Sequence, residues 1–276
     1  MENDTKTMTN YSNMEFNIGS LQNEVIRIAE KAGEEIMQVY SLSDFSNVVN
    51  FKSDDSPLTL ADKNAHESIF NDLKVLAPEI PIISEEGSDV PYEERKNWKR
   101  FWMVDPLDGT KEFISRNNEF TVNIALVEND VPIFGVIYLP VDKIVYCGTV
   151  GKGAFKIEGG IKSSIQTNQK FEDLTAIGSR SHASSEESEM LRKYSVRNTV
   201  SAGSSLKFCR VAEGKADLYL RFNPTMEWDT AAGQAIVEAA GGFVADLDNN
   251  RFSYNKRILK NGSFLCVSHL GLLGQQ

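Results

Sequence analysis

The segment WMVDPLDGT, residues 102–110, places two aspartates directly after a run of apolar residues. An apolar run of this kind predicts a buried strand. Pro106 restricts the backbone just after Asp105 and favours a fixed turn, whereas Gly109 lets the chain come close to a ligand. Residues 109–111 resemble the first turn of a helix, whose free N–H groups suit an anion.

The two aspartates of this segment conflict with an anion site unless a cation lies beside them. A lone aspartate at a strand end is most often a turn residue or a helix N-cap. Asp105 and Asp108 together, next to a helix start that attracts anions, should repel the anion. Divalent cations between the carboxylates remove the conflict. Hard oxygen ligands with a phosphate as a further ligand describe a Mg²⁺ site.

Further carboxylates stand at the ends of other expected elements. Glu85 and Glu86 follow the short apolar strand PIIS, and Asp229 lies in EWDTAAGQAIVEAAGG at the expected N-cap of a helix. Taken singly, the glutamates fit a solvated loop and Asp229 fits a cap. Together they are carboxylates at the ends of separate elements, which is how metal sites on α/β scaffolds are built.

Composition limits the class of protein. The 276 residues allow one large domain or two modest ones. A net charge of −10 argues against a nucleic-acid binder. No apolar run is long enough to cross a membrane, and polar residues 1–16 predict a disordered tail rather than a signal peptide. Three widely spaced cysteines predict buried free thiols and a reducing cytoplasm.

The apolar pattern predicts two regions of different organisation. Apolar residues at helical spacing predict helices at 17–40 and 58–76, before a β meander of three or four strands at 119–158. We place a domain boundary in the polar stretch that follows, giving domains at 17–160 and 161–276. Alternation in the second domain predicts a sheet covered by helices. The expected strands are 174–178, 198–201, 217–222, 242–247 and 263–268, and the expected helices are 184–195, 204–213 and 229–240.

Three motifs carry a resemblance to a known family. WMVDPLDGTKEF, the upstream SEE and EWDTAAGQAIVEAAGG resemble the signatures of the inositol-monophosphatase superfamily of Mg²⁺-dependent phosphatases. DGTKEFISRNNEFTVNIALVENDVPIFGVIYLP and GSSLKFCRVAEGKADLYLRFNPTMEWDTAAG are similar to the branch of 3′(2′),5′-bisphosphate nucleotidases of the CysQ type. The resemblance covers roughly residues 20–268. It implies an α+β fold, a layered α-β-α-β-α sandwich of the inositol-monophosphatase and fructose-1,6-bisphosphatase type.

The resemblance also implies a metal site with two or three Mg²⁺ ions. Asp105 would bridge two metals, Glu85 would bind one, and the backbone carbonyl of Leu107 would complete one coordination sphere. Asp108 and Asp229 would hold the second metal. By the same resemblance, Glu85, Leu107, Asp108 and Asp229 also contact the substrate, and Li⁺ is expected to inhibit.

The catalytic roles that the resemblance implies fall on three residues. Asp62, in TLADKNAH, would pair with Thr110 to orient the attacking water, with Glu85 as the third catalytic group. The N–H groups of Gly109 and Thr110 would meet the substrate phosphate. A metal-bound water loses its proton readily, and two metals about 3.5–4 Å apart would stabilise the attacking and leaving oxygens.

Four residues of the second half are expected near the rest of the substrate. By resemblance, His182 lies near the nucleotide, while Ser204, Lys207 and Arg221 contact the region of a second phosphate. Taken alone, His182 fits a surface histidine in a polar loop, and Ser204 fits a helix N-cap. Lys207 and Arg221 equally fit solvated faces. Two cations near one pocket suit an anionic substrate with a second phosphate.

The expected function is therefore a Mg²⁺-dependent 3′(2′),5′-bisphosphate nucleotidase. It would convert adenosine 3′,5′-bisphosphate to AMP and phosphate, and the sulfated precursor is a further possible substrate. Two alternatives remain open at this point: an inositol or sugar monophosphatase, and a non-catalytic Mg²⁺- or nucleotide-binding regulator. We expect a cytoplasmic protein, with peripheral association at the inner membrane left open. The sequence does not determine the oligomeric state.

Overall fold

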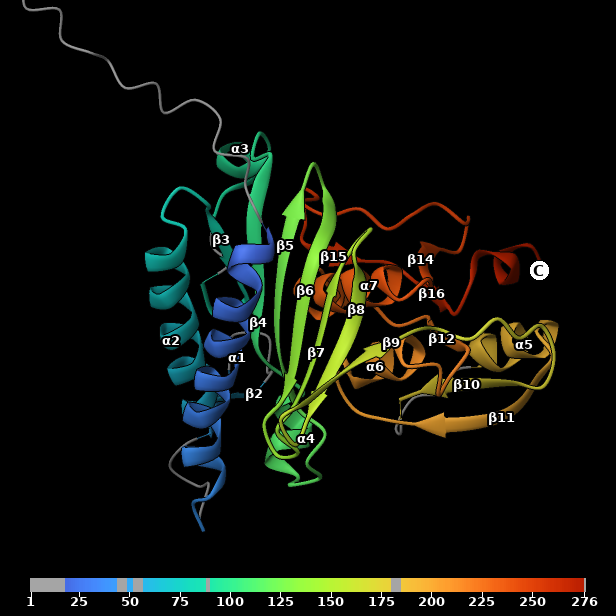
Figure 1. The fold of residues 1–276 in the computed structure, drawn as a ribbon, viewed down its shortest axis with the longest axis horizontal. Coiled ribbons are helices and arrows are strands. Elements are labelled where there is room, and N and C mark those ends of the chain that lie inside the picture. Colours follow the sequence, from blue (N-terminus) through green and yellow to red (C-terminus); the bar gives the residue numbers. More distant parts are fainter. Residues whose placement is uncertain (1–17, 44–48, 52–56, 88–89, 180–184, 276) are drawn as a thin grey trace, which may run out of the picture.

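Five layers of secondary structure make up the molecule (Figure 1). The computed structural model describes residues 18–43, 49–51, 57–87, 90–179 and 185–275. In these residues a helical layer, a seven-stranded sheet, a second helical layer, a five-stranded sheet and an outer helical layer follow one another. The predicted α-β-α-β-α sandwich is thus confirmed. The expected tail at 1–16 and His182 lie outside the described residues.

The first layer contains the two predicted N-terminal helices. Helix α1 spans Ile18–Tyr40 and α2 spans Leu60–Leu76. Strands β1 (Val49–Phe51) and β2 (Pro57–Thr59) pair between them. The apolar stripes of both helices pack on each other and on one face of the seven-stranded sheet, as the helical spacing predicted.

The seven-stranded sheet is antiparallel apart from the pair β3–β4. Along β4, alternate residues face opposite cores: Phe101 and Met103 point to the middle helical layer, whereas Trp102 and Val104 point to α1 and α2. Both faces are therefore covered. In spatial order the strands are β3 (Ile82–Ser84), β4 (Arg100–Asp108), β5 (Thr121–Glu128), β6 (Val131–Leu139), β7 (Ile144–Thr149), β8 (Gly153–Glu158) and β9 (Ile161–Ile165).

Two features of this half differ from the sequence expectations. Strand β9 extends the first sheet beyond residue 160, where we placed the boundary, because Gly159 and Gly160 form the left-handed turn of a β8–β9 hairpin. A short helix α3, Tyr92–Arg95, lies between β3 and β4 and was not predicted. A single turn of helix is too short to show a helical period.

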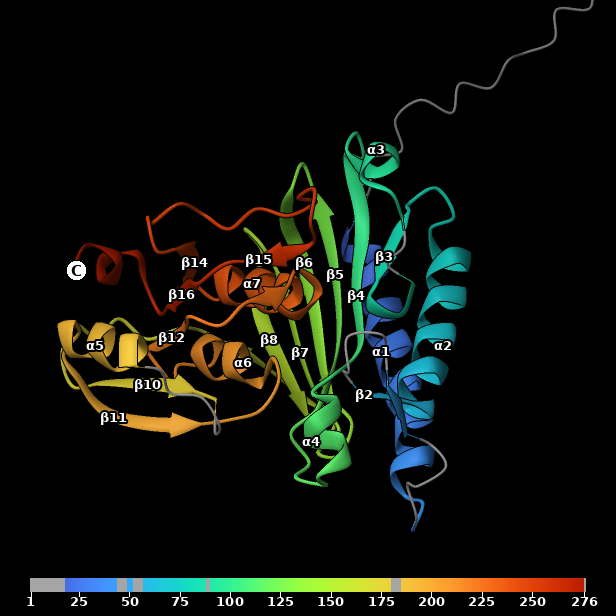
Figure 2. The ribbon, with the colours of Figure 1, turned by 180° about the vertical axis from the view of Figure 1, so that it is seen from behind.

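The second half forms a five-stranded sheet with helices on both faces, as its alternation predicted (Figure 2). Helices α6 (Leu206–Ala212) and α7 (Trp228–Ala239) lie between the two sheets. Helix α5 (Ser185–Lys193) and the 3₁₀ helix η2 (Leu270–Gln275) pack on the outer face. In spatial order the strands are β11 (Val196–Ser201), β10 (Leu174–Gly178), β12 (Leu218–Arg221), β16 (Phe264–Val267) and β14 (Phe243–Asp246).

Two other expectations concern the thiols and membranes. Cys147, Cys209 and Cys266 are buried and free, as predicted. Among the described residues, no helix combines the length and the apolar character that crossing a membrane requires.

Helix α7 approaches the first sheet closely at two paired glycines. Gly135 on β6 lies opposite Gly148 on β7. A Cβ atom at Gly135 would lie 2.4 Å from the carbonyl oxygen of Ala232, and one at Gly148 would lie 2.7 Å from the Cα of Ile236. Both contacts are with helix backbone, which cannot give way as a side chain can. The missing side chains therefore let the backbone of α7 lie directly against the sheet, and this contact fixes how far the helix, including its first turn, stands from the sheet.

We expect Gly135→Ala to lower the free energy of unfolding by about 1–3 kcal/mol, because the added methyl group must push α7 off the sheet. Urea denaturation followed by circular dichroism measures this change. Gly262→Ala is the matched control, since no heavy atom lies within 4 Å of a Cβ built there. Equal losses in the two variants would contradict the close-packing account.

Candidate active site

The end of β4 carries two carboxylates on a distorted piece of strand. Asp105 and Asp108 both pair with β5, but the two residues between them, Pro106 and Leu107, oppose a single residue, Val122. This is a β-bulge, a device that re-aims side chains at the end of a strand. The N–H of Leu107 donates to Oδ1 of Asp105 at 3.1 Å, which fixes the bulge.

The Asp105 carboxyl is the centre of a group of acidic side chains. Asp105 is buried, with 1% of its surface exposed. Burial raises its pKa well above the ordinary range, and the negative charges of Glu85, Asp108, Asp229 and Asp62 raise the pKa further. The structure therefore brings the five predicted acidic residues within electrostatic reach of one another, from α2, the 3₁₀ helix η1 (Glu85–Gly87), β4 and α7.

Asp229 reaches this group from the first turn of α7. The sequence suggested that Asp229 is the N-cap of this helix, but Glu227 occupies that position. Asp229 is the second residue of the helix. Its Oδ2 accepts a hydrogen bond of 2.9 Å from the N–H of Met226. Burial, followed by the charge of Asp108, raises the pKa of Asp229 to about 8.

Asp62 is fixed by a capping box at the start of α2. Its Oδ2 accepts hydrogen bonds from the N–H of Thr59 at 2.7 Å and from the hydroxyl of Thr59 at 2.5 Å. Its Oδ1 accepts the hydroxyl of Thr110 at 3.2 Å, so the structure brings together the predicted pair. Burial raises the pKa of Asp62, the Thr59 bonds oppose that shift, and the charge of Glu85 adds to it. Thr59 was missed, although TLAD fits the capping-box pattern.

Asp108 joins the two halves of the chain. Its Oδ2 accepts the N–H of Ser205 at 2.5 Å and the side-chain amide of Asn123 at 3.3 Å. The hydroxyl of Ser205 also donates to Oδ1 of Asn123 at 2.7 Å. Asn123 and Ser205 were not predicted, and a polar residue inside the apolar strand FTVNIAL was the available signal for Asn123.

Ser204 differs from its sequence interpretation as a helix N-cap. Ser205 is the N-cap of α6, while Ser204 has a φ of +44°, in the left-handed region that most residues avoid. In the described part of the chain, the buried hydroxyl of Ser204 has no hydrogen-bond partner. A buried polar atom without a partner is costly, so this hydroxyl is available to a ligand.

A cavity of about 490 Å³ adjoins the acidic group. Six of the predicted residues line it: Asp108, Gly109, Ser204, Lys207, Arg221 and Asp229. Asp62, Glu85, Asp105, Leu107 and Thr110 are not in its lining. Gly109 has a φ of +95°, which suits glycine, and a Cβ there would meet Ser204 at 3.3 Å. Lys111, Glu112 and Tyr219 also line the cavity and were not predicted.

Two cations of the second half, Lys207 and Arg221, line the cavity. Lys207 is 3% exposed, and its ammonium donates to the carbonyl of Ser204 at 2.6 Å. Burial lowers the pKa of Lys207 to about 8, although the charge of Asp108 opposes the shift. For Arg221, burial alone would lower the pKa. The interactions with Tyr219 and then Asp229 raise it by more, so the pKa of Arg221 lies above its ordinary value. Lys207 is thus buried rather than on a solvated face, and Arg221 is half-buried.

The donor chemistry of the acidic group fits Mg²⁺. Carboxylate oxygens crowd together at a buried position, and a divalent cation would relieve their repulsion. In the part of the chain that the structure describes, no three His, Cys, Asp or Glu side chains make up a metal site by themselves. Mg²⁺ does not require a cage made of protein side chains alone, since substrate phosphate and water ordinarily complete its coordination shell.

Comparison with known proteins identifies the family. The model described as the inositol monophosphatase family matches residues 19–273. The chain belongs to the inositol monophosphatase family. Enzymes of this family are generally Mg²⁺-dependent, which agrees with the donor chemistry of the site.

The inositol monophosphatase family includes close relatives of this chain. The 3′(2′),5′-bisphosphate nucleotidase CysQ of Shigella flexneri is 50% identical over 235 residues, 85% of this chain and 94% of that protein. CysQ of Escherichia coli strain K12 is 49% identical, again over 85% of this chain and 94% of that protein. The crystal structure of CysQ from Bacteroides thetaiotaomicron has a TM-score of 0.80 and 42% identity, and the match covers 92% of this chain and 98% of that one.

We expect the protein freed of metal by a chelator to lose stability as pH rises from about 4 to about 8. The folded chain keeps the Asp229 proton up to a pKa of about 8, whereas the ordinary value is 3.8. A carboxyl with a raised folded pKa stabilises the fold below its unfolded pKa, and this contribution is lost as pH rises through the folded pKa. Urea denaturation across this range gives the slope.

Asp229→Asn should reduce that slope, and Asp142→Asn, at an exposed position, should leave it unchanged. A slope of the same size in Asp229→Asn and the parent protein would show that Asp229 is not the group concerned.

Proposed function

We propose that the chain is a Mg²⁺-dependent 3′(2′),5′-bisphosphate nucleotidase that hydrolyses the 3′-phosphate of adenosine 3′,5′-bisphosphate to give AMP and phosphate. One observation carries the proposal: a single cavity is lined both by carboxylates, at Asp108 and Asp229, and by cations, at Lys207 and Arg221. A metal-bridged phosphate would lie against the carboxylates and a second phosphate against the cations. The names of the CysQ relatives support this substrate.

The acidic group would hold the phosphate that is removed. Glu85, Asp105, Asp108, Asp229 and the carbonyl of Leu107 are the proposed ligands, for two or three ions, and inhibition by Li⁺ is expected. Mg²⁺ bound there would lower the pKa of a water molecule and offset the charge of the phosphate oxygens.

Asp62 and Thr110 would orient the attacking water. Because the Thr110 hydroxyl donates to Oδ1 of Asp62, its oxygen lone pairs remain to accept a hydrogen bond from water. That arrangement aims the water, and the Asp62 carboxylate can take up its proton. Glu85 is the third proposed catalytic group. The N–H groups of Gly109 and Thr110 would contact the same phosphate.

The second phosphate would lie against the cations. Lys207 and Arg221 supply the charge, and the hydroxyl of Ser204, which has no partner in the described residues, supplies a donor. An inositol monophosphate has no second phosphate to meet these groups. His182, outside the described residues, stays a predicted nucleotide contact on the strength of the resemblance alone.

Two further predictions concern substrate range and location. Hydrolysis of the sulfated precursor stays a prediction, as does a cytoplasmic location inferred from the free thiols. No observation in the described residues supports association with the periphery of a membrane.

Phosphate release tests the proposal. We expect rapid release from adenosine 3′,5′-bisphosphate, slower release from inositol 1-phosphate, and none from either with a chelator. Arg221→Leu should raise KM for the bisphosphate by about tenfold to a hundredfold, since a hydrogen bond to a charged group contributes about 1.5–3 kcal/mol. The same variant should leave the inositol 1-phosphate rate unchanged.

Arg197→Leu is the matched control, because Arg197 is exposed and pairs only with the exposed Asp173 among the ion pairs of the described residues. Equal rates on the two substrates in the parent protein would favour the monophosphatase alternative. Release of phosphate from neither substrate would favour a non-catalytic regulator.

A further inference from the structure

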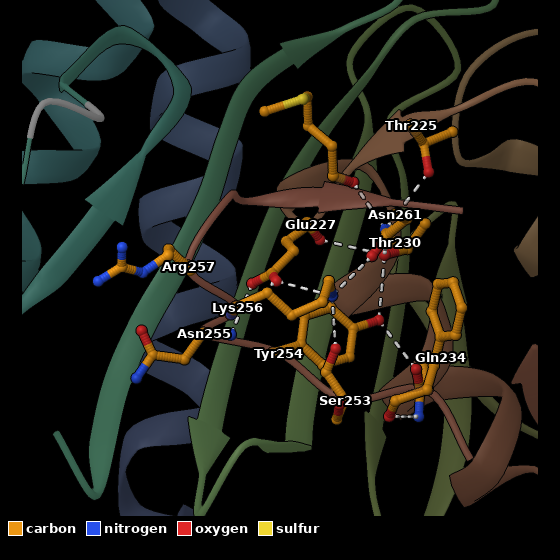
Figure 3. Close-up of polar contacts among 12 residues, drawn as sticks. Thr225, Glu227, Thr230, Gln234, Ser253, Tyr254, Asn255, Lys256, Arg257 and Asn261 are labelled. Atoms are coloured by element: carbon orange, nitrogen blue, oxygen red, sulfur yellow. Dashed lines mark hydrogen bonds and ion pairs between the residues drawn. The ribbon is translucent and has the colours of Figure 1, made fainter. Parts of the chain in front are cut away.

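A buried carboxylate next to Asp229 has no part in the proposed chemistry. Glu227 is fully buried at the N-cap of α7. Its Oε2 accepts the N–H of Asn255 at 2.7 Å, and its Oε1 accepts the N–H of Lys256 at 3.0 Å and pairs with the Lys256 ammonium at 2.7 Å (Figure 3). Residues 255 and 256 therefore surround the Glu227 carboxylate with three donors.

Lys256 also connects, through Asn261, to Met226, the residue that holds the Asp229 carboxylate. The Lys256 ammonium also donates to Oδ1 of Asn261 at 3.0 Å, and the Asn261 amide donates to the carbonyl of Met226 at 3.0 Å. Met226 in turn donates its N–H to the Asp229 carboxylate. Strands β13 (Thr225–Met226) and β15 (Lys260–Asn261) pair at this point. A continuous path of bonds thus links Glu227 to the Asp229 side chain. Figure 3 shows the part of this path that runs from Glu227 through Lys256 to Asn261.

Asn255 connects the segment to the first half of the chain. Asn255 has a φ of +66°, which presents its N–H to Glu227. Its side chain exchanges two hydrogen bonds with Arg95 on α3: the guanidinium donates to Oδ1 at 2.7 Å, and the amide donates to the Arg95 carbonyl at 2.9 Å. Arg95 is 3% exposed and also donates to the Arg257 carbonyl at 3.1 Å. Glu85 lies only seven residues before α3.

We infer that Glu227, Lys256, Asn255 and Arg95 form a clamp that sets the position of Asp229 against the carboxylates of β4, and so sets the affinity of the site for Mg²⁺. These are positioning residues, since none of them lines the cavity. Asp229 is repelled by Asp108, and the clamp holds it in place against that repulsion. Residues that orient metal ligands typically change metal affinity by about 10–100-fold when replaced. The inference rests on the proposed Mg²⁺ site.

Glu227→Gln tests the clamp because it keeps the size and removes the charge that binds Lys256. We expect isothermal titration of the metal-free protein with Mg²⁺ to show affinity reduced about tenfold or more. Hydrolysis should need correspondingly more Mg²⁺, while KM for the bisphosphate at saturating Mg²⁺ stays unchanged. Glu238→Gln is the control, since Glu238 is a buried, paired carboxylate at the other end of α7.

Unchanged Mg²⁺ affinity in Glu227→Gln, or an equal loss in Glu238→Gln, would overturn the clamp. If Glu227→Gln does not fold, Asn255→Gly tests the clamp instead. Glycine adopts the positive φ of this position without strain, so the substitution removes only the side-chain link to Arg95. Asn255→Gly should also lower Mg²⁺ affinity, and parent-like affinity would overturn the clamp. Altered Mg²⁺ binding in a protein that never hydrolyses the nucleotide would leave the clamp standing and refute the proposed function.

Discussion

Repulsion among buried carboxylates is the constraint on which the rest of the structure depends. Asp105 is almost fully buried and lies under the influence of four other acidic side chains. Folding must bring these groups together at a cost, since a buried charge loses its hydration. The site is therefore held by its surroundings: a bulge in β4, the capping box around Asp62, and the hydrogen bonds that Asp108 receives from Ser205 and Asn123.

Helix α7 delivers Asp229 to this group, and its placement comes from packing rather than from attraction. Paired glycines at 135 and 148 let the helix backbone rest on the first sheet. The buried Glu227, which is bonded to Lys256 and through Asn255 to Arg95, holds the first turn of the helix. The arrangement concentrates negative charge where a divalent cation can neutralise it, and the cations Lys207 and Arg221 line the same cavity as Asp108 and Asp229.

Much of the fold could be predicted because its signals are local. Helical spacing gave α1 and α2, strand and helix alternation gave the second half, and the DPLDGT, SEE and WDT motifs pointed to the acidic residues that the structure brings together. Where the signal was short or ambiguous, prediction was wrong. The left-handed Ser204 places the N-cap of α6 at Ser205 rather than at Ser204, and the glycine pair after β8 forms a hairpin that carries the first sheet on to Ile165.

The remainder of the site depends on contacts between distant positions, which leave no pattern in a single sequence. Asn123 and Ser205 are 82 residues apart, and Arg95 and Asn255 are 160 apart. Each residue alone is an ordinary polar residue in a strand or loop. Only the tertiary structure shows that each pair joins the two halves at the site.

Anomalous diffraction from a crystal containing Mn²⁺ and AMP with phosphate would test the central claim most directly. The account predicts a manganese peak about 2.1 Å from a carboxylate oxygen of Asp105, with Asp108 and Asp229 among the ligands. Phosphate should lie beside it, and the nucleotide's remaining phosphate should face Lys207 and Arg221. Manganese bound only elsewhere, with no peak at the end of β4, would contradict the account.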